Sequence, residues 1–295
     1  ISSTTARTSR SVVSAVAVAR FRNVIAMPAL YHGKEHLVHR LITIPFSHYN
    51  ERARWGLELC RVPYREEAYL PGMHILPVAW ATKLGGRADR VSSPLSTPLL
   101  VTSDGDVVQD SGAILRFADA RRADGTPTLF SSTEAEELSE RYHDELGPHA
   151  RRIAYHHLFT APDAIRDAAY RSVGRAQATT FWLLRRVVRA AITRALNVTD
   201  EAAARSVDRV ERLFEETSRR LADRPFLAGD AFTAADLSFA SLAAPVLLPS
   251  HEEGFGNDGL PRQDSIPEAW SSLSRALRAT PAGAHAMRMF RDHRR

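Results

Sequence analysis

Residues 96–117 read STPLLVTSDGDVVQDSGAILRF, and this stretch decides the fold. Two short apolar runs flank a polar turn that contains Gly105, a residue type that tolerates the positive φ of tight hairpin turns. Asp110 and Ser111 follow the second run directly, and both residue types favour the start of a helix. The stretch therefore predicts a β-hairpin that leads without a spacer into a helix over residues 110–120.

The chain upstream of the hairpin predicts a strand, a helix and a second strand. The first strand is a short apolar run, the helix has apolar residues at helical spacing behind Asn50, and the second strand alternates apolar and polar residues. These elements cover residues 41–44, 50–61 and 62–69, and an irregular crossover with a short helix around 78–84 follows. The order β-α-β, crossover, β-β-α indicates one α/β domain, which we place at residues 37–121.

The chain after this domain predicts only helices. Residues 122–131, RADGTPTLFS, are rich in Gly, Pro and Thr and predict a linker. Beyond it we find no strand pattern, so we expect an all-helical domain over residues 132–295. Its expected helices cover residues 133–159, 163–196, 200–221, 234–247 and 267–278, with a short helix after the last.

The excess of basic residues is concentrated at the start of the chain. The net charge is +5, and residues 1–38 contribute +4 of it through five basic residues and one acid. The rest of the chain is close to neutral, so we expect no nucleic-acid partner, and we interpret the cluster Arg185, Arg186 and Arg189 as a solvated helix face. Residues 1–36 form a flexible or targeting-like leader rich in Ser, Thr, Ala and Arg, with a disordered tail or an early start site as alternatives.

Cysteine content and hydropathy narrow the class of protein further. Cys60 is the only cysteine, which excludes an intrachain disulfide and a Cys-X-X-Cys redox pair. No window is apolar over the roughly 20 residues that a transmembrane helix needs, so we expect no membrane partner and a cytoplasmic location, with organelle targeting by the leader as the alternative. The aromatic residues expected in the core or in a pocket wall are Trp80, Phe181, Trp182 and Phe239.

The order of elements and two motifs resemble the N-terminal domain of glutathione S-transferases. The motifs are Ser-Thr-Pro-Leu-Leu-Val before the hairpin and Gln-Asp-Ser-Gly-Ala-Ile-Leu at the start of the next helix. In the helical half, Thr233 and Asp236 form a capping-box-like pair that resembles the folding signature of this family. The resemblance covers roughly residues 38–250. It implies a thioredoxin-like glutathione-binding domain followed by an all-α C-terminal helical bundle.

The resemblance also implies where glutathione binds. In this family the proline that corresponds to Pro98 is cis, and the backbone of Thr97 or Leu99 beside it would pair with the cysteinyl part of glutathione like an added strand. Ser111 would hold the γ-glutamyl carboxylate at a helix N-terminus, where free N–H groups and the helix dipole favour an anion. Asp110 would bind the γ-glutamyl amine, although the family usually has the longer Glu or Gln at this position.

The loop between the first strand and the first helix carries the expected catalytic residue. Ser47 lies where family members carry a catalytic Ser or Cys, so its hydroxyl could donate a hydrogen bond to the glutathione sulfur and favour the thiolate. The alternative role of Ser47 is to cap the helix that follows. His48 and Tyr49 are rival donors, and the lack of a cysteine at position 47 argues against thiol–disulfide exchange as the main activity.

The resemblance implies a glutathione transferase that conjugates glutathione, as co-substrate, to a small hydrophobic electrophile, and it implies a homodimer. The alternatives are a non-enzymatic binding or assembly module with the same fold, and a glutathione-dependent reductase or dehalogenase. We expect no metal site, because no H-E-x-x-H pattern or carboxylate at ligand spacing accompanies the histidines of the helical half. The histidines that most invite a metal interpretation are His143, His149, His156 and His157.

Overall fold

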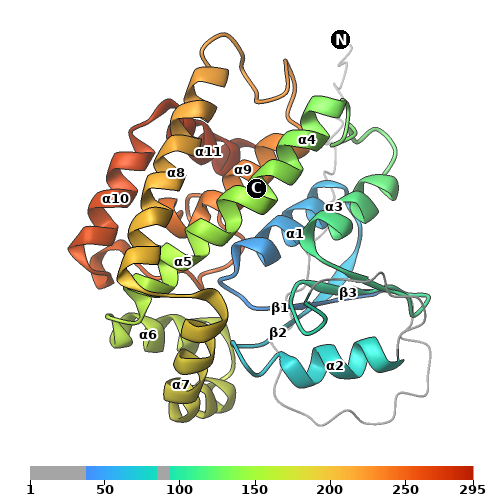
Figure 1. Cartoon of the computed structure of the whole chain (residues 1–295). Helices are drawn as coiled ribbons and strands as arrows, with labels where there is room; N and C mark the ends of the chain where they lie inside the picture. Colours follow the sequence, from blue (N-terminus) through green and yellow to red (C-terminus); the bar gives the residue numbers. More distant parts are fainter. Residues whose placement is uncertain (1–37, 85–92, 295) are drawn as a thin grey trace, which may run out of the picture.

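A mixed sheet organises the first half of the chain (Figure 1). The computed structural model describes residues 38–84 and 93–294, so the expected leader over residues 1–36 lies outside the described residues. Within them the sheet has four strands in the order β2-β1-β3-β4. The strands are β1 (His39–Thr43), β2 (Tyr64–Ala68), β3 (Leu99–Val101) and β4 (Val107–Gln109). β1 runs parallel to β2 and antiparallel to β3, and β3 and β4 form the expected hairpin.

Helices cover both faces of this sheet. α1 (His48–Leu59) and α3 (Ser111–Ala120) lie on one face and α2 (Ile75–Leu84) lies on the other (Figure 1). Successive strand residues point to opposite faces, and Ile42 and Leu99 accordingly pack with Val78 of α2. Leu41 and Leu100, one position away on each strand, belong instead to the large core shared with α1 and α3. This arrangement is the thioredoxin-like half that the sequence predicts.

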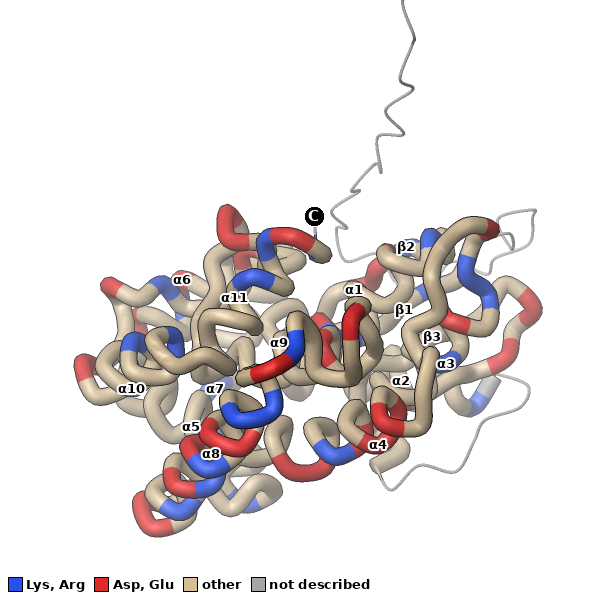
Figure 2. Tube along the Cα trace, turned by 90° about the horizontal axis from the view of Figure 1, so that it is seen from above, with Lys and Arg blue, Asp and Glu red and all other residues tan. Residues whose placement is uncertain are grey.

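The second half of the described chain is helical. Its elements are α4 (Thr133–Arg141), the π-helical segment η1 (Tyr142–Leu146), α5 (Gly147–Leu158), α6 (Pro162–Ser172), α7 (Arg175–Leu196), α8 (Asp200–Arg220), α9 (Ala234–Leu247), the 3-10 turn η2 (Gln263–Ser265), α10 (Glu268–Arg278) and α11 (Pro281–His293). Acidic and basic residues alternate along α8 in Figure 2, as expected for a solvated helix face.

The structure corrects several of the sequence-based element boundaries. The expected single helix over 163–196 is two helices, because Val173 and Gly174 both adopt extended backbone conformations between α6 and α7. The expected helix over 133–159 is interrupted by the wider π-helical turn of η1. Trp80, expected in the core or in a pocket wall, is 58% exposed on α2.

Helix α9 forms the centre of the molecule. All of its residues are buried, and α1, α4, α5, α10 and α11 pack around it. In Figure 2, α9 lies beside α1, where the thioredoxin-like half meets the helical half. A helix that is apolar all round is stable only when it is surrounded in this way. The start of α1 is therefore set against the core of the other half.

Candidate functional site

The loop between β1 and α1 presents Ser47 at the start of a helix. Ser47 has extended backbone angles at the N-cap of α1, but its side chain makes no hydrogen bond to a helix N–H group. The side chain of Ser47 therefore does not cap α1, which was the alternative role that the sequence left open. Ser47 is partly exposed and lines a cavity between the two halves of the molecule. Its hydroxyl can thus reach a ligand that enters the cavity.

The two rival donors of this loop are engaged elsewhere. His48 Nε2 lies 3.0 Å from the carbonyl oxygen of Gly147, which makes this nitrogen the protonated one. Burial lowers the pKa of His48 to about 3, so the ring is neutral. Tyr49 donates its hydroxyl to the His143 carbonyl at 3.1 Å, and burial raises its pKa to about 12. Of the three candidates, Ser47 is the one whose side chain makes no hydrogen bond to the helix it precedes or to another described residue.

Thr97 and Pro98 lie beside the start of α1. Their peptide bond is cis, and the Pro98 carbonyl accepts a hydrogen bond from the Asp110 N–H at 3.3 Å. Leu99 belongs to β3, between β1 and β4, whereas Thr97 precedes the ladder. Asn50 in the first turn of α1 donates from Nδ2 to Thr97 Oγ1 at 3.2 Å. This bond ties the residues before β3 to the helix that Ser47 precedes.

The start of α3 combines an unusual backbone with a buried hydroxyl. Asp110 has φ of 88° and ψ of 139°, a region that a residue with a side chain rarely adopts. Its carboxylate caps α3 by accepting from the N–H groups of Gly112 at 2.7 Å and Ala113 at 3.3 Å. These two N–H groups are therefore not available to a ligand. The N–H and the hydroxyl of the buried Ser111 are what this helix start still offers to an anion.

Arg52 adds a buried positive charge to this helix start, and sequence reasoning missed it. Its Nη1 donates to Ser111 Oγ at 3.3 Å and to His143 Nδ1 at 2.9 Å. Nε and Nη2 donate to the hydroxyls of Ser238 at 2.9 Å and Ser139 at 2.7 Å. The nearest groups among the described residues are thus neutral, and burial lowers the pKa of Arg52 to about 10.

His143 completes the polar cluster, and the sequence considered it only as a metal ligand. Its Nδ1 accepts from Arg52, so Nε2 carries the hydrogen, and this atom lies 3.4 Å from Asp110 Oδ2. Arg52 and His143 are 91 positions apart in the chain. No local sequence pattern predicts a contact between residues so far apart. The available signal was that Arg52 lies in the first turns of α1, the helix that Ser47 precedes.

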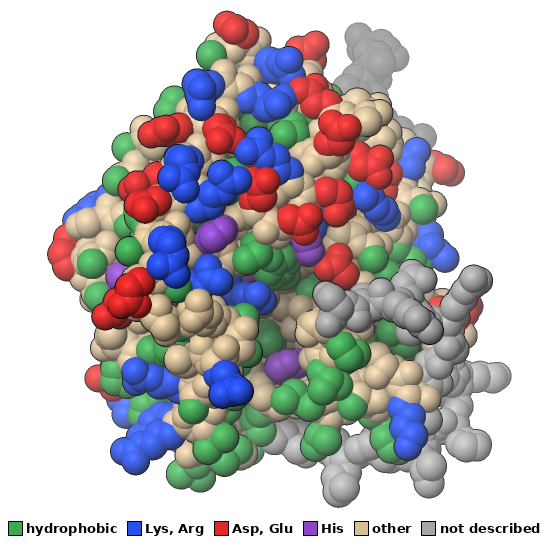
Figure 3. Space-filling model, in the orientation of Figure 1, with side chains coloured by type: hydrophobic (Ala, Val, Ile, Leu, Met, Phe, Trp, Pro, Cys, Tyr) green, Lys and Arg blue, Asp and Glu red, His purple; other side chains and the backbone are tan. Residues whose placement is uncertain are grey.

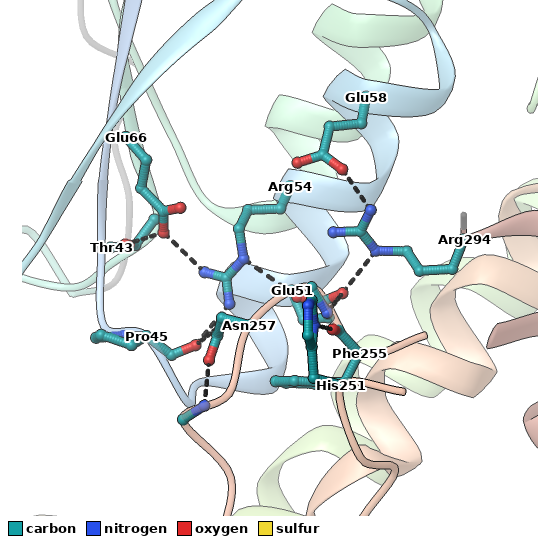
Figure 4. Close-up of polar contacts among 12 residues, drawn as sticks. Thr43, Pro45, Glu51, Arg54, Glu58, Glu66, His251, Phe255, Asn257 and Arg294 are labelled. Carbon is teal, nitrogen blue, oxygen red and sulfur yellow. Dashed lines mark hydrogen bonds and ion pairs between the residues drawn. The ribbon is translucent and has the colours of Figure 1, made fainter. Parts of the chain in front are cut away.

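A buried ionic network fixes the beginning of α1 (Figure 4). Glu51 is fully buried and pairs with Arg54 at 3.1 Å and with Arg294 at 2.7 Å, and these arginines hold its pKa below the usual value against the opposing effect of burial. Arg54 Nη2 and Asn257 Nδ2 both donate to the carbonyl of Pro45 at 2.6 Å. The loop that carries Ser47 is therefore clamped by residues from near the end of the chain.

The cavity between the two halves has a volume of about 240 Å³. Phe46, Ser47 and Pro71 line it from the thioredoxin-like half, and most of the helical lining is apolar, including Phe181 and Trp182. Figure 3 shows a hollow near the middle of the molecule with hydrophobic and basic side chains at its rim.

Of the predicted site residues, only Ser47 contributes to the lining of this cavity. The predicted glutathione residues group around the starts of β3 and α3 instead, namely Thr97, Pro98, Leu99, Asp110 and Ser111. The hydrogen bond from Asn50 to Thr97 links this second region to the first turn of α1, which Ser47 precedes.

His156 and His157 are ring neighbours with centroids 5.0 Å apart, and His143 and His149 make separate contacts. His149 Nδ1 lies 3.0 Å from Ser206 Oγ, and His157 stacks on Trp270 with ring centroids 5.7 Å apart. Over residues 38–84 and 93–294, no group of three or more His, Cys, Asp and Glu side chains is placed to hold a metal ion. In the same ranges no helix combines the length and apolar character needed to cross a bilayer.

Comparison with sequence models of protein families gives two matches. The model described as the N-terminal domain of glutathione S-transferase matches residues 46–121, and the model described as the C-terminal domain matches residues 200–279. Together they cover just over half of the chain. A search among curated proteins found no match.

Solved structures with similar folds share little sequence with this chain. Gtt2 from Saccharomyces cerevisiae is 19% identical, with a TM-score of 0.47 over 84% of this chain and 99% of its own. A glutathione S-transferase from Rhodospirillum rubrum F11 is 16% identical, with a TM-score of 0.48 over 87% and 99%. A glutathione S-transferase from Methylobacillus flagellatus KT, solved with glutathione bound, is 15% identical, with a TM-score of 0.44 over 84% and 98%.

The fold and the candidate site define a protein with a thioredoxin-like half and a helical half. Ser47, at the start of α1, faces the cavity between these halves. The two domain matches alone are sufficient to assign this chain to a family. The chain belongs to the glutathione S-transferase family.

Proposed function

We propose that the protein is a glutathione transferase that conjugates the glutathione thiolate to a hydrophobic electrophile. The observation that carries this proposal is the position of Ser47, whose hydroxyl caps nothing and lines the apolar cavity at the N-terminus of α1. A hydroxyl that donates to the glutathione sulfur favours the ionised thiol, and the positive end of the helix dipole acts in the same direction. Ser47 would stabilise the thiolate and would not itself be a nucleophile.

The polar cluster at the start of α3 supports binding of the γ-glutamyl end of glutathione. The N–H and hydroxyl of Ser111 can donate to the carboxylate, and the buried charge of Arg52 lies beside them. Asp110 Oδ2 is not used in the helix cap and can accept from the amine. Between these groups and Ser47, the backbone of Thr97 would pair with the cysteinyl unit. Thr97 suits this role better than Leu99, which already lies within the ladder.

We assign residues 37–121 to glutathione binding, residues 122–131 to a linker and residues 132–295 to the helical domain. The electrophile would occupy the cavity against the helical domain, next to the sulfur held at Ser47. Holding both reactants in place converts a bimolecular step into an effectively unimolecular one, which can lower the barrier by several kcal/mol. Members of the family are usually dimers, which supports a homodimer, and we place the protein in the cytoplasm.

The cysteine content gives no support to thiol–disulfide exchange. Cys60 is fully buried, and burial raises its pKa to about 11, so its thiolate is disfavoured. A glutathione-dependent reductase would need a reactive thiol at the start of α1, where this chain has Ser47. Conjugation is the chemistry that a hydroxyl at this place can assist.

Retention on immobilised glutathione and conjugation of 1-chloro-2,4-dinitrobenzene test the proposal. The wild type should be retained and should turn over, and Ser47→Ala should remain folded with kcat/KM lowered by about 100-fold, as for loss of one donor to a developing anion. Ser272→Ala, on the exposed side of α10, is the matched control and should keep full activity. Retention without turnover in the wild type would favour the non-enzymatic module, and an unchanged rate in Ser47→Ala would remove Ser47 from the site.

A further inference from the structure

The cavity next to Ser47 is apolar but strongly positive. Of the described residues that line it, four are arginines and none is Asp or Glu. Arg151 comes from α5, and Arg185, Arg186 and Arg189 come from α7. The sequence suggested a solvated face for the α7 cluster, and Arg186 and Arg189 are indeed exposed, yet all three also line the cavity.

The contacts of these arginines leave their charges uncompensated within the described part of the chain. Arg185 donates to the Trp182 carbonyl at 2.7 Å and lies 4.2 Å from the centre of the Trp182 ring. Arg189 donates to the Phe159 carbonyl at 3.1 Å and lies 5.2 Å from that ring centre. Carbonyl groups and ring faces orient a guanidinium without neutralising it.

Arg151 is half-buried at the wall of the cavity. Its guanidinium lies 5.6 Å from the centre of the Tyr49 ring, and its Nε is buried without a hydrogen-bond partner among the described residues. A buried donor without a partner costs free energy unless a ligand satisfies it. Arg151 therefore favours an acceptor group inside the cavity, close to the loop of Ser47.

We propose that the electrophile taken by this cavity is an organic anion, with an apolar or aromatic body and a carboxylate or sulfonate group. The apolar lining would cover the body, and the arginines would bind the acidic group by charge-assisted hydrogen bonds in a partly desolvated site. This inference rests on the proposed function, because it names the substrate class for the same conjugation.

Two aryl chlorides that differ in one substituent isolate the effect of the negative charge of the electrophile. In 4-chloro-3,5-dinitrobenzoate the glutathione sulfur forms a bond to the ring carbon, chloride leaves with the electron pair of the C–Cl bond, and the thiol proton passes to solvent. The neutral 4-chloro-3,5-dinitrobenzamide reacts in the same way. Dividing each enzymatic kcat/KM by the uncatalysed rate with glutathione removes the difference in intrinsic reactivity.

The test compares this pair in the wild type, in Arg185→Gln/Arg189→Gln and in Arg185→Lys/Arg189→Lys. The wild type should prefer the benzoate by about tenfold, the glutamine variant should lose most of this preference, and the lysine variant should keep part of it. The matched control, Arg175→Gln/Arg194→Gln, removes two charges from the same helix outside the cavity and should keep the wild-type preference. Added salt should weaken the preference.

Two outcomes would overturn the inference. One is a wild type that treats both compounds alike or prefers the benzamide. The other is a glutamine variant that raises the KM of glutathione while the preference persists, because the arginines would then serve the carboxylates of glutathione.

Calorimetric binding of the same two compounds without glutathione separates this inference from the proposed function. If neither compound is conjugated, the proposed function fails, and the inference on the cavity stands only if the benzoate still binds more tightly than the benzamide. Equal binding of the two compounds would then overturn the inference as well.

Discussion

His48 shows how burial decides the state of a residue next to the reactive position. Its pKa is lowered from 6.5 to about 3 by burial, so the unfolded chain binds a proton at this position at a higher pH than the folded chain does. The stability linked to His48 is therefore complete above pH 6.5 and is lost as the pH falls toward 3.

Replacing His48 by Gln should reduce the acid sensitivity of the fold. The Gln amide can still donate to the Gly147 carbonyl but cannot take up a proton. We expect the wild type to lose about 2 kcal/mol more unfolding free energy than His48→Gln between pH 6.5 and roughly 4.5. Urea unfolding at a series of pH values measures this difference, and equal slopes in the two proteins would contradict a neutral, buried His48.

The sequence could identify the site residues that belong to local motifs, but it could not exclude the neighbours of Ser47. It favoured Ser47 and left His48 and Tyr49 as rival donors, because the contacts that engage these two side chains involve Gly147 and His143, which are about a hundred positions away. Arg52 was missed for the same reason, since its hydrogen-bond partners come from other helices. The assignment of Ser47, Ser111 and the residues beside Pro98 to glutathione stays a prediction.

At the scale of elements, the start of α1 depends on Arg294, the residue that follows α11. Arg294 is buried and pairs with Glu51 and Glu58 of α1, and the pairing with these carboxylates raises its pKa. Removing one partner of a buried ion pair leaves the other charge uncompensated, which costs far more than the loss of an exposed pair.

Arg294→Met should lower the unfolding free energy by about 3 kcal/mol or more, because Glu51 would lose one of its two arginines. Arg291→Met is the matched control, since Arg291 is exposed on α11 and, among residues 38–84 and 93–294, its ion pair is with its neighbour Asp292. That variant should stay within about 0.5 kcal/mol of the wild type. Similar urea midpoints for the two variants would contradict the importance of this clamp.

Helix α9 depends on a carboxylate that does more than cap it. Asp236 forms the expected capping box with Thr233, and it also accepts from the Leu227 N–H and lies 2.9 Å from His285 Nε2. The side chain is completely buried, so its removal leaves several polar groups without partners.

Asp236→Ala should therefore cost about 3 kcal/mol of unfolding free energy, which exceeds the roughly 1 kcal/mol of an ordinary cap. Asp208→Ala, on the exposed side of α8, should change it by less than about 0.5 kcal/mol. Denaturant unfolding of both variants measures these losses of unfolding free energy. A loss of only 1 kcal/mol would mean that the contacts with Leu227 and His285 contribute little.

The elements with local start and stop signals were predicted well. The interruptions within two of the expected helices were not predicted. The hairpin with Gly105 and the helices that begin at Ser111 and Ala234 occur where their caps and turns predict them. The break at Gly174 was missed because apolar residues recur at helical spacing on both sides of it. The π-helical turn at Tyr142–Leu146 was missed because it keeps the chain helical while shifting its phase.

For the whole molecule, the two halves share one hydrophobic core. Trp55 of α1 packs against Phe290 of α11 with ring centroids 5.0 Å apart, and its Nε1 donates to the His293 carbonyl at 3.0 Å. Arg52 extends from α1 to Ser238 of α9. An interface with an extensive apolar core and buried polar contacts resists separate movement of its halves.

Unfolding should consequently be a single cooperative transition. Trp55 lies between the halves, so tryptophan fluorescence should lose its folded signal at the same urea concentration as far-ultraviolet circular dichroism. The coincidence should persist when the fluorescence of Trp270, in α10, is removed by Trp270→Phe. Two separated transitions would show that the thioredoxin-like half and the helical half unfold independently.

The ultraviolet absorbance of the thiolate in bound glutathione tests most directly whether Ser47 ionises the thiol. Titrating the complex with pH gives the pKa of the bound thiol, and the same titration on Ser47→Ala isolates the contribution of the hydroxyl. The wild type should bind glutathione with a thiol pKa about 2 units below that of free glutathione, and Ser47→Ala should return most of the way to the free value. A bound thiol that titrates identically in both proteins would contradict the role given to Ser47.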